Sequence, residues 1–168
     1  MVSLVVSVGV VAIVALLALS AFFSSSETAI FTLPEGWGDG TESDPRYEVL
    51  HELRSDPHRL LVTILVGNNV VNVAIASTTT ALLIEFLPTG SAVSVATVLA
   101  SFVVLVFGEI VPKSYGLSHA RGWSLAVARP ISILERAMYP LVVVFDFITR
   151  RLNALIGGDP DIEDPYTE

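Results

Sequence analysis

The sequence predicts an all-α membrane protein with three transmembrane helices, cytoplasmic short helices and an amphipathic juxtamembrane helical segment. Hydrophobic residues make up 52% of the chain and charged residues only 15%, and the charges are gathered into blocks. Each of three stretches without a charged side chain exceeds the roughly 20 residues that a helix needs to cross hydrocarbon. These stretches are Val2–Ser26, Leu60–Ile84 and Phe86–Gly108. The predicted spans cover about residues 3–32, 58–86 and 91–111.

The first apolar stretch has a second interpretation, a cleaved signal peptide. The small residues from Ala18 to Ala21 loosely resemble a cleavage site. However, no Lys or Arg precedes the apolar run, and the run is long for a signal core. We therefore expect this segment to be retained as a membrane helix.

The basic residues predict the orientation of the three spans. All nine Lys and Arg side chains lie either between spans one and two or after span three. Basic residues accumulate on the cytoplasmic side of membrane proteins. We expect a multi-pass protein of the cell membrane whose amino terminus and Leu87–Gly90 turn are outside and whose carboxyl terminus is cytoplasmic. The net charge of −8 argues against nucleic acid as a partner.

Two Asp-Pro pairs mark helix starts in the cytoplasmic part. Asp44-Pro45 and Asp56-Pro57 each read as an N-cap followed by proline at the first helical position. They predict a short helix over about 45–55 and the start of the second membrane helix at Pro57. The Gly-rich stretch from Pro34 to Ser43 between span one and this helix is predicted to be a loop.

After span three, apolar residues three and four positions apart predict an amphipathic juxtamembrane helix over about 130–156, which Pro140 is expected to bend. The stripe consists of Ile131, Leu134, Met138, Leu141, Phe145, Ile148, Leu152 and Leu155. A fourth span is the less favoured alternative, because charges such as Glu135 and Arg150 leave too short an apolar run. The same stripe offers a surface for dimerisation.

The last residues, 157–168, are acidic and rich in turn-forming residues. We expect a linker that leads to a further cytoplasmic domain; a disordered tail is the alternative. The remainder, 1–156, is expected to form one transmembrane domain. The chain has no cysteine, so it has neither a disulfide framework nor a thiolate metal site.

Glu109 is the residue that most needs an explanation, because it ends an otherwise uncharged membrane run. A carboxylate at membrane depth costs at least about 2.5 kcal/mol unless a proton or a cation neutralises it. Other spans supply polar groups as well. Ser20, Ser24 and Glu27 share one face of the first helix, and Asn68 and Asn72 lie one turn apart in the second, with Gly67 and Asn69 beside them.

Backbone carbonyls are a further source of oxygen ligands. Pro112 has no N–H, so a helix that continues through it leaves the Gly108 carbonyl without its usual donor. Gly67 likewise has no side chain to shield its backbone. Each feature also has a structural interpretation: serines and glycines pack helices closely, asparagines join helices by hydrogen bonds, and Pro112 ends the helix. Their coincidence with a carboxylate favours an ion site.

The donor set consists of hydroxyl, amide, carbonyl and carboxylate oxygens, which favour Mg²⁺, Ca²⁺ or Na⁺ over zinc or copper. His51, His58 and His119 all fall outside the predicted spans. The chain has no His-Glu-x-x-His pair, no Gly-rich phosphate loop and no nucleophile with a base in the spans. The residues that a hydrolytic enzyme would need are therefore missing from this pattern.

Three ordered motifs resemble the transmembrane domain of the CorC/cyclin-M (CNNM) family of Mg²⁺ transporters. They are Ser20-Ala21-Phe22-Phe23-Ser24-Ser25-Ser26-Glu27-Thr28-Ala29, Gly67-Asn68-Asn69-Val70-Val71-Asn72 and Gly108-Glu109-Ile110-Val111-Pro112-Lys113. Members of this family are dimers in the lipid bilayer, and a cytoplasmic pair of ATP-binding CBS modules follows this domain. The resemblance therefore implies a homodimer and a CBS-pair domain in the full-length protein.

The resemblance also implies a secondary transporter and not an enzyme. It implies Na⁺-coupled Mg²⁺ export through a dehydrated site between the three helices, with Mg²⁺ as the transported ion and Na⁺ as the coupling ion. The positions that match the family's ion-binding residues are Ser20, Ser24, Gly67, Asn68, Asn72, Gly108 and Glu109. Glu27, Asn69, Pro112 and Lys113 are expected to support them. Ser25 and Ser26 stand where glycine is more usual in the family.

Two other functions stay open at the level of sequence. The chain can be a membrane anchor and dimerisation module for a cytoplasmic sensor domain, with its polar residues joining helices and no transport of its own. It can also be a passive cation channel, whose flux would not depend on a Na⁺ gradient.

Overall fold

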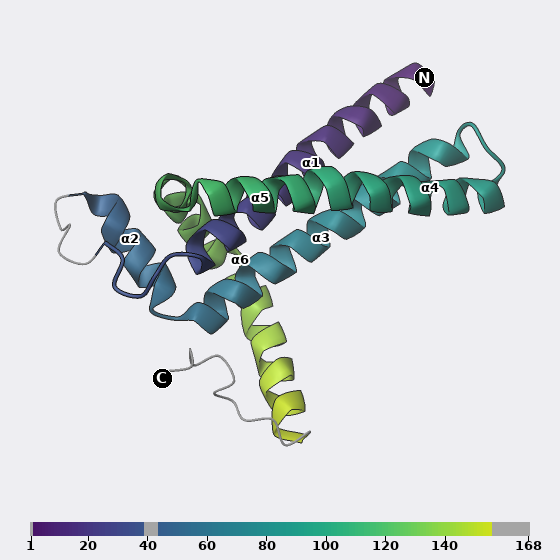
Figure 1. Cartoon of the computed structure of the whole chain (residues 1–168). Coiled ribbons are helices and arrows are strands. Elements are labelled where there is room, and N and C mark those ends of the chain that lie inside the picture. Colours follow the sequence, from purple (N-terminus) through teal and green to yellow (C-terminus); the bar gives the residue numbers. More distant parts are fainter. Residues whose placement is uncertain (1, 39–43, 156–168) are drawn as a thin grey trace. The chain divides into compact units, whose positions relative to one another are not determined.

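The computed structural model describes residues 2–38 and 44–155 (Figure 1). Within these ranges the regular structure is entirely helical, which confirms the predicted all-α class. The helices are α1 (Val2–Phe31), α2 (Pro45–Arg54), α3 (Pro57–Ile84), α4 (Thr89–Val103), the π-helical η1 (Val104–Ile110), α5 (Val111–Ser118) and α6 (Ala120–Leu155). The expected linker at 157–168 lies outside the described residues, as does part of the Pro34–Ser43 loop.

Three helical stretches are long and apolar enough to cross a membrane, as predicted. They are Leu4–Phe31, Pro57–Ile84 and Thr89–Ser118. The third extends well past the expected end near 111, because α4, η1 and α5 follow one another without a break. The residues at both junctions, Val103 and Val104, then Ile110 and Val111, have right-handed helical backbone angles. Pro112 therefore does not end this helix.

The juxtamembrane helix begins earlier than expected. His119, with φ −118° and ψ 21°, separates α5 from α6, and α6 then runs from Ala120, not from about 130, to Leu155. Pro130 and Pro140 both lie inside α6, and the bend at Pro140 stays a prediction. This helix is not among the three stretches apolar enough to span.

The chain forms two compact units, which we describe separately. The first contains residues 1–37 and 67–124, and the second contains residues 38–66 and 125–168. The first unit thus holds α1, most of α3, all of α4, η1 and α5, and the first turn of α6. Every residue proposed for ion binding belongs to this first unit.

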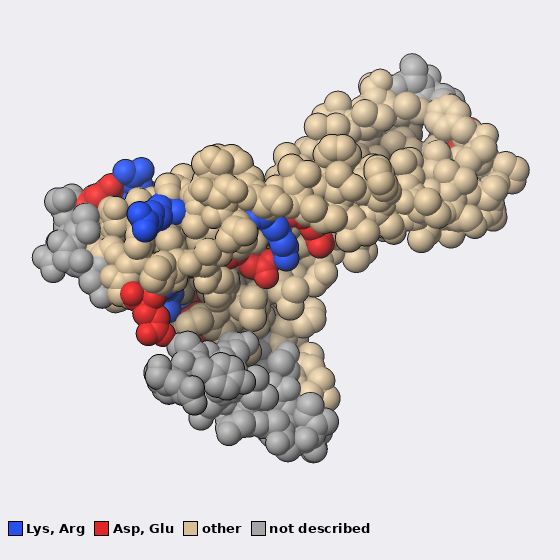
Figure 2. Space-filling model, viewed as in Figure 1, with Lys and Arg blue, Asp and Glu red and all other residues tan. Residues whose placement is uncertain are grey.

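In the first unit, α1 packs along η1 and α5. Phe23 and Ile30 of α1 and Ile75 of α3 are buried in its interior. Ala92, Ala96 and Ala100 form a buried stripe of small side chains on α4, which allows neighbouring backbones to approach closely. The visible surface over α4 and the first half of α1 shows almost no charge, as a lipid-facing surface requires (Figure 2).

In the second unit, both predicted caps are present. Asp44 accepts a hydrogen bond from the Arg46 N–H at the start of α2, and Asp56 accepts one from the Arg59 N–H at the start of α3. Leu50 and Leu53 of α2 are buried. These caps explain why the two helices begin where the Asp-Pro pairs predicted.

The juxtamembrane stripe is only partly covered in the second unit. Ile131 is buried, and Met138 packs against Val62 and Val66 of α3. Further along α6 the stripe is exposed in the single chain, at Leu141, Phe145, Ile148 and Leu152. The first part of the predicted stripe therefore forms an intramolecular contact, and the later part remains available to lipid or another chain.

Glu135 of α6 forms an ion pair with Arg59 of α3, whose guanidinium also lies 5.2 Å from the ring centre of Tyr139. Burial raises the pKa of the Glu135 carboxyl, and Asp56 and Glu52 also raise it, while Arg59 lowers it. A raised folded-state pKa means that the proton is held more tightly in the folded protein. The contribution to stability is therefore complete below the unfolded pKa and is lost as pH rises through the folded pKa.

We expect Glu135→Gln to remove this part of the pH dependence. Thermal unfolding in neutral detergent, followed between pH 4 and pH 7, will show a smaller loss of stability on raising the pH in this variant than in the wild type. Glu48→Gln, which changes an exposed carboxylate of α2, is the matched control and should keep the wild-type profile. Equal profiles for Glu135→Gln and the wild type would contradict the assignment.

Candidate functional site

Four polar side chains from three helical segments form a hydrogen-bonded group in the first unit, which we call the oxygen cluster: Ser20, Asn68, Asn72 and Glu109. Ser20 Oγ lies 3.1 Å from Asn68 Oδ1 and 2.8 Å from Asn72 Oδ1. Asn72 Nδ2 donates to Glu109 Oε1 at 3.3 Å. The structure thus brings together residues that are far apart in the sequence.

Oxygen atoms from α1, α3 and η1 converge in the oxygen cluster. The Ser20 hydroxyl carries one hydrogen, yet two amide oxygens lie within hydrogen-bond distance of it. The carboxylate of Glu109 adds further lone pairs, and its bond from Asn72 is long for an N–H···O contact. Oxygens that converge in this way are suited to a cation.

Ser24 lies one turn along α1 from Ser20 and is fully buried. Within the described part of the chain its Oγ atom has no hydrogen-bond partner. Its neighbours differ: Ser25 and Ser26 both donate to the carbonyl of Phe22, at 3.1 and 2.6 Å, and Thr28 donates to that of Ser24. A buried hydroxyl without a partner costs about 1–3 kcal/mol, a cost that a ligand bonded to it would offset.

Two glycines expected near the site have different surroundings. A Cβ atom at Gly108 would lie 2.7 Å from Ser20 Oγ, so only glycine lets η1 approach the oxygen cluster this closely. A Cβ atom at Gly67 would instead lie 2.6 Å from the ring of Phe23. Gly67 therefore serves the packing of α3 against an α1 aromatic ring, and its carbonyl role stays a prediction.

The π-helical segment η1 carries both Gly108 and Glu109. Its last turn is closed by the Val111 N–H, which donates to the Val106 carbonyl, five residues back instead of four. Pro112 follows at once and has no N–H. The carbonyl of Gly108 therefore lacks its α-helical donor, and that of Phe107 lacks the donor that the π register would require.

The sequence did not reveal this π-helix, although Pro112 was a signal of it. A proline inside an α-helix removes one hydrogen bond and crowds the preceding turn. A wider turn just before the proline relieves that crowding, and such bulges recur at functional sites. The result is a carboxylate next to two carbonyls that cannot bond to residue 112, because Pro112 has no N–H.

Glu27 and Lys113, expected to support the site, form an ion pair at 3.2 Å, and both side chains are partly exposed. They lie about one helical turn beyond Ser24 and Glu109 respectively. Asn69 is exposed and takes no part in the hydrogen bonds of the oxygen cluster. The structure thus separates this ion pair and Asn69 from the hydrogen-bonded group.

Sequence reasoning missed the residues that hold α5 against α1. Trp123 Nε1 donates to Ser25 Oγ at 3.0 Å, and the Trp123 ring meets Tyr115 edge to face. A Cβ atom at Gly116 would overlap the carbonyl oxygen of Ser25. The small-residue position Gly116 was the available signal, because a glycine inside a membrane helix often marks a close backbone approach.

The donor groups that the site offers are oxygens, and one of them is a carboxylate. In the residues that the structure describes, no group of three or more His, Asp and Glu side chains is placed to hold a metal ion. A hydroxyl, two amide oxygens and one carboxylate from the oxygen cluster, with the buried Ser24 hydroxyl nearby, are hard donors. Such a set is suited to hard cations such as Mg²⁺, Ca²⁺ or Na⁺ and not to zinc or copper.

Comparison with known protein families gives a clear match. The family model for the cyclin M transmembrane N-terminal domain matches residues 11–168. The chain belongs to this family. The match covers α1 from residue 11 onward and all the other helices, so the oxygen cluster lies within the cyclin M domain.

Curated relatives of this cyclin M domain occur in plants and bacteria. A putative chloroplastic DUF21 domain-containing protein of Arabidopsis thaliana is 39% identical over 85% of this chain and 22% of its own length. The UPF0053 inner membrane protein YfjD of Escherichia coli is 34% identical over 86% of this chain and 34% of its own. A UPF0053 protein of Haemophilus influenzae is 33% identical over 88% and 35%.

The chain therefore spans about a third or less of the length of the relatives it matches. Its three apolar helices make it a multi-pass membrane protein, and the cyclin M and UPF0053 families are associated with the transport of ions across membranes. Any proposal for the transported ion and for the coupling ion must therefore be argued from the residues of this chain.

Proposed function

We propose that this cyclin M domain exports Mg²⁺ from the cell in exchange for Na⁺, through a site made by the oxygen cluster and Ser24. The observation that supports this most directly is the buried Ser24 hydroxyl, which has no partner in the described chain and lies one turn from the oxygen cluster. A cation coordinated by Ser24 would satisfy this hydroxyl. Hydrogen bonds that only join the helices leave it without a partner.

The charge of the site suits turnover. Glu109 alone neutralises half of a divalent charge, so binding is modest and release remains possible. Mg²⁺ requires six ligands in near-octahedral geometry at about 2.0–2.1 Å and gives up water reluctantly. The oxygens of Ser20, Ser24, Asn68, Asn72 and Glu109 supply most of such a shell, and a glycine carbonyl or water completes it.

Binding requires one rearrangement within the oxygen cluster. Asn72 Nδ2 now donates to Glu109 Oε1, and this oxygen must exchange the N–H for the cation. Because that bond is long at 3.3 Å, little is lost in the exchange. Na⁺ binds the same oxygens, or beside them, in the opposite phase of an alternating-access cycle, since its single charge is matched by the one carboxylate.

Orientation and assembly are part of the proposal. The segments that contain the basic residues face the cytoplasm, and the amino terminus lies outside. Two copies associate in the bilayer as a homodimer, and a cytoplasmic CBS-pair domain follows the domain in the full-length protein. The exposed later part of the α6 stripe is available for such contacts.

The test uses two serines of α1 that are matched in burial and differ in hydrogen bonding. Ser24 and Ser26 are both fully buried, but Ser26 Oγ is bonded to the Phe22 carbonyl. We expect Mg²⁺ at ten times its dissociation constant to stabilise the wild type by about 1.4 kcal/mol in thermal unfolding at constant ionic strength. This protection should disappear in Ser24→Ala and persist in Ser26→Ala.

Without Mg²⁺, the two substitutions should change the free energy of unfolding in opposite directions. Ser24→Ala removes an unsatisfied buried hydroxyl and should raise the stability without Mg²⁺, whereas Ser26→Ala loses a hydrogen bond and should lower it by about 1 kcal/mol. Equal Mg²⁺ protection in Ser24→Ala and the wild type would exclude Ser24 as a ligand.

A non-transporting anchor is the second candidate. It is favoured by the direct bonds of Ser20 to Asn68 and Asn72, which join α1 to α3 without an ion. An anchor predicts that Mg²⁺ has no effect on the unfolding of the wild type or of either serine variant. A passive channel predicts Mg²⁺ protection together with flux that does not depend on a Na⁺ gradient.

A further inference from the structure

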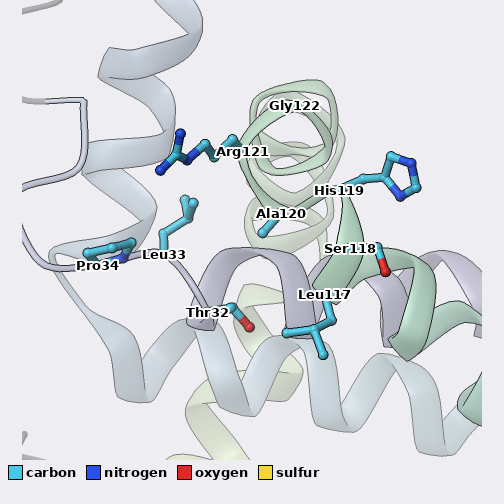
Figure 3. A pocket seen from close by; sticks show the side chains of 9 residues that line it. All are labelled: Thr32, Leu33, Pro34, Leu117, Ser118, His119, Ala120, Arg121 and Gly122. Carbon is cyan, nitrogen blue, oxygen red and sulfur yellow. The ribbon is translucent and has the colours of Figure 1, made fainter.

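A pocket of about 450 Å³ lies in the first unit, and none of its lining residues belongs to the ion site (Figure 3). It is formed where the chain leaves α1, where α5 ends and where α6 begins. The residues that line it are Thr32, Leu33, Pro34, Leu117, Ser118, His119, Ala120, Arg121 and Gly122. Its volume is in the range of small-molecule binding sites.

The pocket lies at the ends of two membrane spans. The first span ends at Phe31 and the third at Ser118, and most of the lining residues follow directly after these two ends. At this level the apolar acyl chains of a bilayer give way to the headgroups. The pocket therefore opens where phospholipid phosphates are concentrated.

The charge of the pocket is one-sided. Arg121 is the one permanently charged residue in its lining, and no acidic residue is among the lining residues. In the described part of the chain no hydrogen bond or ion pair engages the Arg121 side chain. Figure 3 shows it extending from α6 toward Leu33 and Pro34, while the His119 ring points away. A guanidinium of this kind pairs with a phosphate through two parallel hydrogen bonds.

The rest of the lining suits the other parts of a phospholipid. Leu33, Pro34 and Leu117 provide apolar surface for the glycerol and the upper acyl chains. A Cβ atom at Gly122 would meet nothing within 4 Å, so the backbone at the start of α6 is open to a ligand. The first hydrogen bond there is from the Trp123 N–H to the His119 carbonyl, which leaves the preceding N–H groups of α6 as further donors.

We propose that this pocket binds the phosphate of an anionic phospholipid headgroup, with Arg121 as the principal ligand. The shared chemistry is that of a phosphate group, which a free anion can also supply. The apolar lining and the position at two span ends favour the lipid. This assignment is independent of the proposed ion transport, because the pocket shares no residue with that site.

The experiment measures lipid binding to the whole chain by native mass spectrometry in a neutral detergent. Phosphatidylglycerol, phosphatidylcholine and inorganic phosphate are added separately to the wild type, Arg121→Gln and Arg129→Gln. Arg129 is an exposed arginine of α6 outside the pocket, so its variant carries the same loss of charge. Circular dichroism checks that each variant is folded.

We expect the wild type and Arg129→Gln to retain bound phosphatidylglycerol and Arg121→Gln to bind it roughly tenfold more weakly. Arg121→Lys should be intermediate, because lysine keeps the charge and loses the paired geometry. If millimolar inorganic phosphate displaced phosphatidylglycerol, the pocket would still be a phosphate site, but its ligand would be a free anion and the lipid assignment would be wrong. Equal retention of phosphatidylglycerol in Arg121→Gln and the wild type, or equal retention of phosphatidylcholine, would overturn the proposal.

Discussion

Glu109→Gln is expected to reduce Na⁺-dependent Mg²⁺ flux in proteoliposomes at least about 30-fold, because removing one member of a buried charge interaction typically costs 2–5 kcal/mol. Glutamine keeps the shape and one oxygen of the side chain, so the loss measures the charge. The same variant should also lose protection by Mg²⁺ in thermal unfolding. Asn72 loses only a weak acceptor, since the bond it makes to Glu109 is 3.3 Å long.

Glu85→Gln is the matched control for this experiment. Glu85 lies just after the end of α3, is exposed, and contacts none of the residues of the oxygen cluster through a hydrogen bond. Its variant should transport and bind Mg²⁺ like the wild type. Wild-type flux in Glu109→Gln would contradict the proposed site. Loss of flux with unchanged protection by Mg²⁺ would mean that Glu109 acts in the transport step and not in binding.

Gly116→Ala is expected to destabilise the first unit by about 1–3 kcal/mol or more, the range for a side chain forced into a packed interior. The new methyl group would overlap the Ser25 carbonyl oxygen and lie 3.1 Å from the carbonyl carbon and Cα of the same residue. Backbone atoms cannot rotate away as a side chain can. α1 and α5 must therefore separate, and the Trp123 bond to Ser25 is strained with them.

The control for this variant is Gly122→Ala, the same change in the first turn of α6. A Cβ atom there has open space around it, and alanine favours the helix over glycine by up to about 1 kcal/mol. Thermal unfolding in detergent should thus show a loss of stability in Gly116→Ala and no loss in Gly122→Ala. An equal response at both positions would mean that α1 and α5 do not approach as closely as the structure shows.

Much of the fold follows from local sequence patterns. Uncharged runs longer than a bilayer is thick predict helices that cross it, because backbone groups in lipid must bond within their own segment. The Asp-Pro pairs at Asp44 and Asp56 locate two helix starts, since each carboxylate accepts a backbone N–H. The end of the third span was harder to predict, because the effect of Pro112 depends on the register of the preceding turn.

The candidate site was predictable in composition and only in part in geometry. Spacing indicated that Asn68 and Asn72 lie one turn apart on α3, but only the structure shows that Ser20 of α1 lies within hydrogen-bond distance of both. The sequence does not distinguish Gly67 from Gly108. In the structure Gly67 packs against Phe23, whereas Gly108 packs against Ser20. A glycine indicates that another group packs closely against the backbone, but it does not identify that group.

The sequence by itself determined that Glu109 needs a neutralising partner, because the cost of a carboxylate in a membrane run depends only on its depth in the hydrophobic stretch. The tertiary structure decided what surrounds it. The π-turn before Pro112 presents Glu109 to Asn72, and Ser24 is left without the backbone bond that Ser26 makes. Hydropathy is a property of each segment, whereas an unsatisfied hydroxyl depends on which groups the neighbouring helices bring to it.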